Sequence, residues 1–184
     1  MLLGYAIDEQ DLKRNMFDNL ILDDCARYSN IYDLNILNPE FKIRSHKYAI
    51  ACTYDGFVIV SEKFKKFCEF EKYSGLDFIS LPNEATTYWF KVHNILEYDS
   101  ERRGTEFLNY NSICNGYEEI IGANPVCLKR KAPLEDGFFR TDICFGSYAG
   151  KSPIYLIGQL TKLKLEAAGF KDLSFEEIHD NYTW

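Results

Sequence analysis

The stretch GFVIVSEKFKKFCEFEKYSGLDFISL, residues 56–81, decides the fold because it reads as strand, helix and strand. The apolar run at residues 57–60 is typical of a strand that is buried on both faces. Ser61 then stands where a helix N-cap is expected, and Glu62 brings negative charge into the first turn. Gly75 can end the helical segment in a left-handed conformation, and a second apolar strand follows. We therefore predict a strand–helix–strand unit over this stretch.

Residues 154–178 repeat this plan with an apolar run, a helical stripe ended by Gly169, and a second strand. The apolar residues of that strand lie 97 positions after those of the first unit, as Leu173, Phe175 and Ile178 follow Leu76, Phe78 and Leu81. The predicted helical stripe is Leu160, Leu163 and Ala167, and it matches the first helix better at an offset of 96. A duplication and two independent uses of one motif both explain this likeness, and the sequence leaves both open.

Strands are also predicted outside the two units. Residues 86–92, TTYWFKV, are rich in β-branched and aromatic residues and give the clearest strand. Residues 2–7 suit a short first strand. Alternation between Phe41 and Cys52, around the basic patch at residues 44–47, indicates an edge strand or hairpin. Residues 8–22 suit a helix or an irregular segment.

The pattern as a whole predicts an α+β fold with a mixed, mostly antiparallel sheet and two similar strand–helix–strand units. We expect a single domain over residues 1–184. A division into two lobes, at about 1–98 and 99–184, is the alternative.

Composition and charge exclude several classes of protein. Hydrophobic residues make up 46% of the chain, which is enough for a core and excludes intrinsic disorder. The net charge of −7 disfavours non-specific binding of nucleic acid and suits a basic protein partner, although ordinary solubility explains it equally well. No apolar run is long enough to span a membrane, and the N-terminal residues lack the basic region of a secretory signal. We therefore expect a cytoplasmic protein with no membrane or nucleic-acid partner.

The residues that most often bind metals are scattered along the chain. The six cysteines are Cys25, Cys52, Cys68, Cys114, Cys127 and Cys144. In a cytoplasmic protein we expect them to be reduced and mostly buried. His46, His93 and His179 have no second ligand at metal-binding spacing. We therefore predict no metal site, no cofactor and no catalytic residue.

The segment GSYAGKS, residues 146–152, resembles a phosphate-binding loop only at first sight. That loop has four residues between its glycines and a helix directly after its Lys-Ser pair, so that backbone N–H groups surround the phosphates. Here three residues separate Gly146 from Gly150, and Pro153 precedes a predicted strand. We therefore reject phosphate binding by this loop.

Acidic and aromatic residues are crowded together in LEDGFFRTDICFGSYAGKS, residues 134–152. A protein-binding face needs aromatic anchors beside charge. The candidate partner-binding residues are Glu135, Asp136, Phe138, Phe139, Arg140 and Asp142. The alternative is an ordinary strand that places its phenylalanines in the core.

Several of these segments resemble the immunity proteins of bacterial polymorphic-toxin systems and related proteins of unknown function. The likeness rests on VSEKFK at residues 60–65, GLDFISL at 75–81 and EDGFFRTDICFGSYAGKSPIYLIG at 135–158. It covers residues 57–81 and 136–178, and Gly158-Gln159 departs from the pattern in the second unit. The resemblance implies a cytosolic protein that binds and neutralises a cognate toxin, and it supplies no catalytic residues.

Three hypotheses follow from the sequence. The first is a non-catalytic binding protein, an immunity protein whose partner is a basic toxin domain. The second is a small enzyme with its active site on the 136–152 connection, which a deep pocket with a His or Cys beside a carboxylate would favour. The third is a homodimer formed through exposed aromatic strands, which is compatible with the first.

Overall fold

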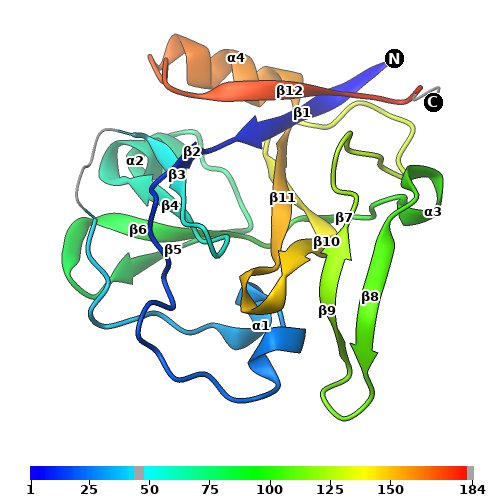
Figure 1. Cartoon of the computed structure of the whole chain (residues 1–184). Coiled ribbons are helices and arrows are strands. Elements are labelled where there is room, and N and C mark those ends of the chain that lie inside the picture. Colours follow the sequence, from blue (N-terminus) through cyan, green and yellow to red (C-terminus); the bar gives the residue numbers. More distant parts are fainter. Residues whose placement is uncertain (44–47, 182–184) are drawn as a thin grey trace.

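The computed structural model describes residues 1–43 and 48–181, and its strands form two sheets that pack together with two longer helices (Figure 1). The larger sheet contains β1 (Leu2–Asp8), β7 (Ile95–Leu96), β8 (Glu106–Asn111), β9 (Gly116–Ile121), β10 (Phe138–Ser147), β11 (Ser152–Ile157) and β12 (Ser174–His179). The smaller sheet contains β2 (Gln10–Asp11), β3 (Ile50–Cys52), β4 (Val58–Ser61), β5 (Leu76–Leu81) and β6 (Glu84–Val92). The helices are α1 (Ile31–Leu34), α2 (Glu62–Phe70), α3 (Ser100–Arg103) and α4 (Gln159–Ala167), with short 3-10 turns η1 (Ala26–Tyr28) and η2 (Tyr148–Gly150).

The predicted α+β class is confirmed, with mostly antiparallel sheets. The strand order is β12-β1-β11-β10-β9-β8 in the larger sheet and β2-β3-β4-β6-β5 in the smaller one, and β7 also pairs with β10. The parallel pairs among the described strands are β2–β3 and β7–β10. In the part of the chain that the structure describes, no helix is long and apolar enough to cross a membrane.

The first strand–helix–strand unit forms where it is predicted. The Ser61 side chain caps α2 by accepting a hydrogen bond from the Phe64 N–H at 3.3 Å. The left-handed residue directly after α2 is Lys72, with φ of 58°, and Gly75 takes a positive φ at the start of β5. Residues 8–22 form an irregular segment apart from β2. The basic patch at residues 44–47 and His46 lie outside the described residues.

The predicted apolar stripe of the second helix is wrong. Leu160 and Leu163 are 50% and 52% exposed, whereas α4 buries Thr161 and Leu165. Thr161 can occupy the core because its hydroxyl accepts a hydrogen bond from the Gly137 N–H at 2.7 Å and is fully hydrogen-bonded there. A prediction from the spacing of apolar residues therefore places the start of the buried face of α4 at Leu160, one position before Thr161.

With this correction, one offset of 97 relates the two units throughout. The helices Glu62–Phe70 and Gln159–Ala167 share it, as do the left-handed residues Lys72 and Gly169 that follow them. The strand registers agree as well. Val60 lies opposite Ile50 and Tyr88, and Ile157, 97 positions later, lies opposite Phe138 and Tyr5. In the same way Ile79 lies opposite Trp89, and Glu176 lies opposite Ala6. The likeness seen in the sequence thus extends to the pairing of every strand around each helix.

The chain therefore consists of two structural repeats, residues 2–81 and 84–179, with their elements in the same order. The first strand of each repeat lies in the sheet of the other: β1 is held between β11 and β12, and β6 between β4 and β5. This reciprocal exchange explains why neither sheet is built from one repeat alone. A division at residue 98 would not separate the sheets, because β1 belongs to the larger one.

Residues at the same place in the two repeats, which we call counterparts, fill one shared core. Both members of these pairs belong to that core: Tyr5 and Tyr88, Ile7 and Phe90, Ile50 and Phe138, Val58 and Tyr155, Val60 and Ile157, and Cys68 and Leu165. Surface details repeat too, since Lys65 lies over the ring of Tyr88 and its counterpart Lys162 over that of Tyr5. The inner faces of both sheets are therefore buried against each other and the helices.

The repeats differ in what lies between the second and third strand of each. Residues 12–43, the first insertion, carry η1 and α1, and residues 97–137, the second insertion, carry α3, β8 and β9. The first insertion covers the outer face of the smaller sheet, and the second covers that of the larger sheet. Figure 1 shows the β8–β9 hairpin extending away from the rest of the larger sheet.

Candidate functional site

The aromatic pair of the predicted partner-binding cluster lies in the interior. Phe138 is 0% exposed, and its ring contacts those of Phe64, Phe90 and Tyr73. Phe139, the next residue of β10, packs into the core on the other face of the sheet. The alternative of an ordinary strand with core phenylalanines therefore describes this pair.

The acidic members of that cluster are exposed, and each has its own partner within the chain. Glu135 forms an ion pair with a nearby arginine at 2.7 Å. Asp136 accepts a hydrogen bond from Lys164 Nζ at 2.7 Å. Asp142 accepts one from the backbone N–H of Tyr98 at 2.8 Å. The structure thus does not bring the six predicted residues onto one face.

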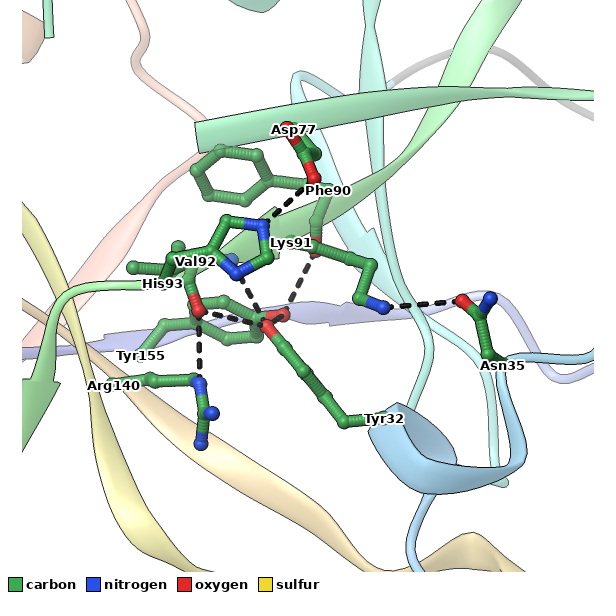
Figure 2. A network of polar contacts seen from close by, with 9 residues as sticks. All are labelled: Tyr32, Asn35, Asp77, Phe90, Lys91, Val92, His93, Arg140 and Tyr155. Carbon is green, nitrogen blue, oxygen red and sulfur yellow. Dashed lines mark hydrogen bonds and ion pairs between the residues drawn. The ribbon is translucent and has the colours of Figure 1, made fainter. Parts of the chain in front are cut away.

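Arg140, the remaining member, belongs to a polar network around Tyr32 of α1 (Figure 2). Its Nε donates to the Val92 carbonyl at 2.9 Å, and its guanidinium carbon lies 4.5 Å from the centre of the Tyr32 ring. Lys91 Nζ lies 4.9 Å from the centre of the same ring. Two cations therefore stabilise one aromatic ring, as cation–π geometry allows.

The hydroxyl of Tyr32 joins the two sheets through a chain of hydrogen bonds (Figure 2). It accepts from the Val92 N–H at 2.9 Å and lies 2.8 Å from the hydroxyl of Tyr155, which donates to the Phe90 carbonyl at 2.8 Å. Since each phenol has one proton, Tyr32 donates to Tyr155. Burial raises the pKa of both phenols, so they stay neutral and are poor bases or nucleophiles. This network fastens α1 to the core.

Other groups with potential chemistry lie in unreactive surroundings. Burial raises the pKa of the Cys52 and Cys68 thiols, and it raises that of Cys144 to about 12. His93 hydrogen-bonds to Asp77 at 2.7 Å on the surface. Within residues 1–43 and 48–181, no three His, Cys, Asp or Glu side chains are grouped to hold a metal. The three thiols are therefore core side chains.

Lys151, from the rejected phosphate loop, is a buried structural cation. It is 2% exposed, and its Nζ donates to the carbonyls of Arg27 at 2.8 Å, Glu118 at 3.3 Å and Tyr148. Burial lowers the pKa of this ammonium to about 8. Because Arg27 lies in the first insertion and Glu118 in the second, Lys151 holds the two insertions together.

A disulfide between Cys25 and Cys114 also joins the two insertions, with their Cα atoms 5.2 Å apart. The prediction of reduced thiols is therefore wrong for this pair, whereas Cys52, Cys68, Cys127 and Cys144 are free. The two residues are separated by 89 positions. Only the folding of the β8–β9 hairpin against η1 brings them together, and no local pattern of residues predicts the bond.

A hollow of about 760 Å³ lies beside this disulfide. Ile113 and Tyr148 line it and are 91% and 57% exposed. Leu22 also lines the hollow, and Ile21, the residue before it, is fully exposed. We define the disulfide face as Asp18, Ile21, Asp23, Asp24, Ile113 and Tyr148.

The disulfide face carries negative charge beside these apolar side chains. Asp23 and Asp24 line the hollow, and Asp18 lines an adjoining one that shares Tyr148. Among the described residues that line the main hollow, the basic one is Arg27, which is paired with Glu118 and lies over the Tyr148 ring at 5.2 Å. Asp23 accepts a hydrogen bond from the Ala26 N–H at 2.9 Å and Asp18 one from the Asn15 side chain at 3.1 Å, but none of the three carboxylates forms an ion pair within the described part of the chain.

The candidate partner-binding residues predicted from the sequence include none of the residues of this face. A single apolar residue, Ile113, stands among polar ones at the tip of the hairpin, which is the one local signal of exposure. Comparisons of the chain with protein-family models, curated proteins and solved structures found no match.

Proposed function

We propose that the chain is a non-catalytic binding protein that holds a basic protein partner on its disulfide face. The observation that carries this proposal is the exposure of Ile113 and Tyr148 directly beside Asp23 and Asp24. Interfaces concentrate their binding energy in such apolar and aromatic anchors, and neighbouring charge selects and steers the partner.

The position of this face in the repeat architecture supports the proposal. The face is built from both insertions and the turn between β10 and β11, whereas the repeated sheets and helices form its support. Binding residues are commonly carried by irregular segments on a rigid scaffold. The Cys25–Cys114 bond and Lys151 hold these segments in place before a partner arrives, which lowers the entropic cost of association.

The resemblance of residues 57–81 and 136–178 to toxin-immunity proteins makes a basic toxin domain the first partner to test. In this proposal the protein neutralises the toxin by contact and performs no reaction. A cytoplasmic location is also part of the proposal. Because reducing compartments keep most thiols unpaired, protein taken from the cell with the Cys25–Cys114 bond intact would contradict this location but not the binding face.

Site-specific photo-cross-linking in the native cell tests the proposal. A cross-linking residue replaces Tyr148, and a second version carries it at Phe70, which is 80% exposed on α2. We expect one basic protein to be captured from position 148 and not from position 70. Capture of the same protein from both positions, or of none from position 148, would refute the disulfide face as the binding site.

Purified partner then allows the charges to be measured. The double variant Asp23→Lys, Asp24→Lys should weaken binding at least tenfold, and more strongly at low salt, because it reverses the charge at the contact. Glu101→Lys, on the exposed surface of α3, is the control for net charge and should bind like the wild type. Equal affinities for all three proteins would contradict the electrostatic part of the proposal.

A further inference from the structure

A second cavity lies on the larger sheet near the end of β1. Its volume is about 590 Å³, within the range typical of small-molecule sites. Ala6, Phe145 and Ile154 line it with apolar surface, and the acidic residues Asp8 and Glu176 of its lining stand on the same face of the sheet as Ala6. The repeat architecture shows what occupies the matching place in the smaller sheet.

At that matching place the space is filled by side chains. The counterparts of Ala6 and Ile154 are Trp89 and Phe57, which are both 0% exposed. The ring of Tyr32 contacts that of Trp89 at 6.2 Å, and the ring of Phe17 contacts that of Phe57 at 5.2 Å, both from the first insertion. Smaller wall residues leave the cavity in the second repeat, where the ring of Tyr98 from the second insertion covers Phe145 only.

The charge at the two places is reversed. In the first repeat Lys91 lies 4.9 Å from the centre of the Tyr32 ring that covers the sheet (Figure 2). Its counterpart is Asp8, whose carboxylate accepts a hydrogen bond from the Ser174 hydroxyl at 2.9 Å. None of the described residues that line the cavity is Lys or Arg. The cation that the structure shows next to the wall is Arg103, whose guanidinium is held by the carbonyl of Asn124.

Glu9 follows Asp8 in the chain but belongs with Ile7 to the other side of β1. Its carboxyl group interacts electrostatically with Cys52 and Tyr155 of the shared core. Loss of hydration, with a smaller effect of Asp8, raises its pKa to about 7. Glu9 is therefore not a contact of an occupant of the cavity.

We propose that this cavity binds a small organic cation, an amine or guanidinium group carried on an apolar or aromatic body. The aromatic body takes the place that Trp89 and Tyr32 fill in the first repeat, and the cation meets Asp8 and Glu176. This site is separate from the disulfide face and does not depend on the proposed protein partner.

Titrations followed by nuclear magnetic resonance test this site with 2-phenylethylamine as the probe. Two analogues of similar size, neutral 2-phenylethanol and anionic 3-phenylpropanoate, serve as controls for charge. We expect saturable shifts of the amide signals of Ala6, Ile154 and Ser174 with the amine, and at least tenfold weaker binding of both analogues. Absence of saturation with the amine, equal binding of the neutral analogue, or shifts confined to other parts of the chain would overturn the proposal.

A variant made from the counterpart residue separates charge from folding. Asp8→Lys installs the residue of the first repeat at an exposed position and should lower affinity for the amine at least tenfold. Glu40→Lys changes the net charge equally at an exposed position of the first insertion, which covers the smaller sheet, and should bind like the wild type. Retention of full affinity by Asp8→Lys, with its native spectrum intact, would also overturn the proposal.

Discussion

Individual side chains decide which parts of the sheet surfaces are core. Thr161 is buried because the Gly137 N–H and Asp136 satisfy its hydroxyl, while Leu160 beside it is half exposed. Phe138 and Phe139 show the same dependence on position, since alternate residues of a strand face opposite sides. Hydrophobicity alone does not distinguish these neighbours.

The burial of Phe138 predicts a large loss of stability on truncation. Phe138→Ala should lower the free energy of unfolding by about 3 to 5 kcal/mol, because it leaves a cavity among Phe64, Phe90 and Tyr73. Phe70→Ala, at a site that is 80% exposed, should change it by less than about 0.5 kcal/mol. Urea denaturation measures both, and similar losses would place Phe138 outside the core.

The raised pKa of Glu9 predicts a stability that depends on pH. Between pH 4.5 and about 7 the folded state keeps the proton that the unfolded state releases, so the stabilisation present at low pH is lost as the pH rises. Glu9→Gln has no carboxyl group to titrate. The difference in free energy of unfolding between this variant and the wild type should therefore shift in favour of the variant by about 2 to 3 kcal/mol from pH 5 to pH 8.

Chemical denaturation at several pH values measures this difference. Glu176→Gln, at an exposed carboxylate, is the matched control. A gap between Glu9→Gln and the wild type that stays constant from pH 5 to pH 8 would show that Glu9 is not desolvated.

Among the elements, the β8–β9 hairpin and η1 depend on each other. The Cys25–Cys114 bond and Lys151 connect them, and both contacts join segments that are distant in the chain. The disulfide closes a loop with a sequence separation of 89, so it strongly limits the unfolded chain. The ordered structure of the disulfide face should therefore depend on this bond.

Reduction of the bond is expected to lower the free energy of unfolding by about 4 to 5 kcal/mol, from the entropy of closing so long a loop. Denaturation with and without dithiothreitol measures the loss. The double variant Cys25→Ser, Cys114→Ser should match the reduced wild type and should not respond to the reductant. A response of the double variant would trace the effect to the free cysteines instead.

Elements with strong local signals were predictable, and their partners were not. The apolar run before Ser61, the cap itself and the residues TTYWFKV identify β4, α2 and β6, because these signals lie within a few neighbouring residues. The place of β1 between β11 and β12 has no local signal, since the contacts join opposite ends of the chain. The disulfide face was missed for the same reason: Asp23 and Ile113 meet only through the fold.

At the scale of the whole molecule, the exchanged strands make the two repeats inseparable. Each repeat supplies an interior strand to the other sheet, and the shared core consists of counterpart residues from both. Loss of one strand would expose the hydrogen-bonding edges of both of its neighbours. The repeats should therefore behave as one cooperative unit.

A cut between the repeats tests this unity in the full chain. A short protease site inserted between Pro82 and Asn83, both exposed in the turn from β5 to β6, can be cleaved after folding. We expect the two fragments to elute together in size-exclusion chromatography and to separate only in denaturant. Fragments that part under native conditions and stay folded would show that the repeats are independent domains.

The exchange of strands also has a consequence for synthesis on the ribosome. The β1 strand leaves the exit tunnel long before β11 and β12, its neighbours in the larger sheet, have been translated. Until then β1 has no partner strand, and its apolar residues, including Leu3 and Ile7, are accessible to chaperones and to aggregation. The larger sheet can close only after translation of β12, so the chain folds as a finished whole and cannot fold piece by piece from its N-terminus.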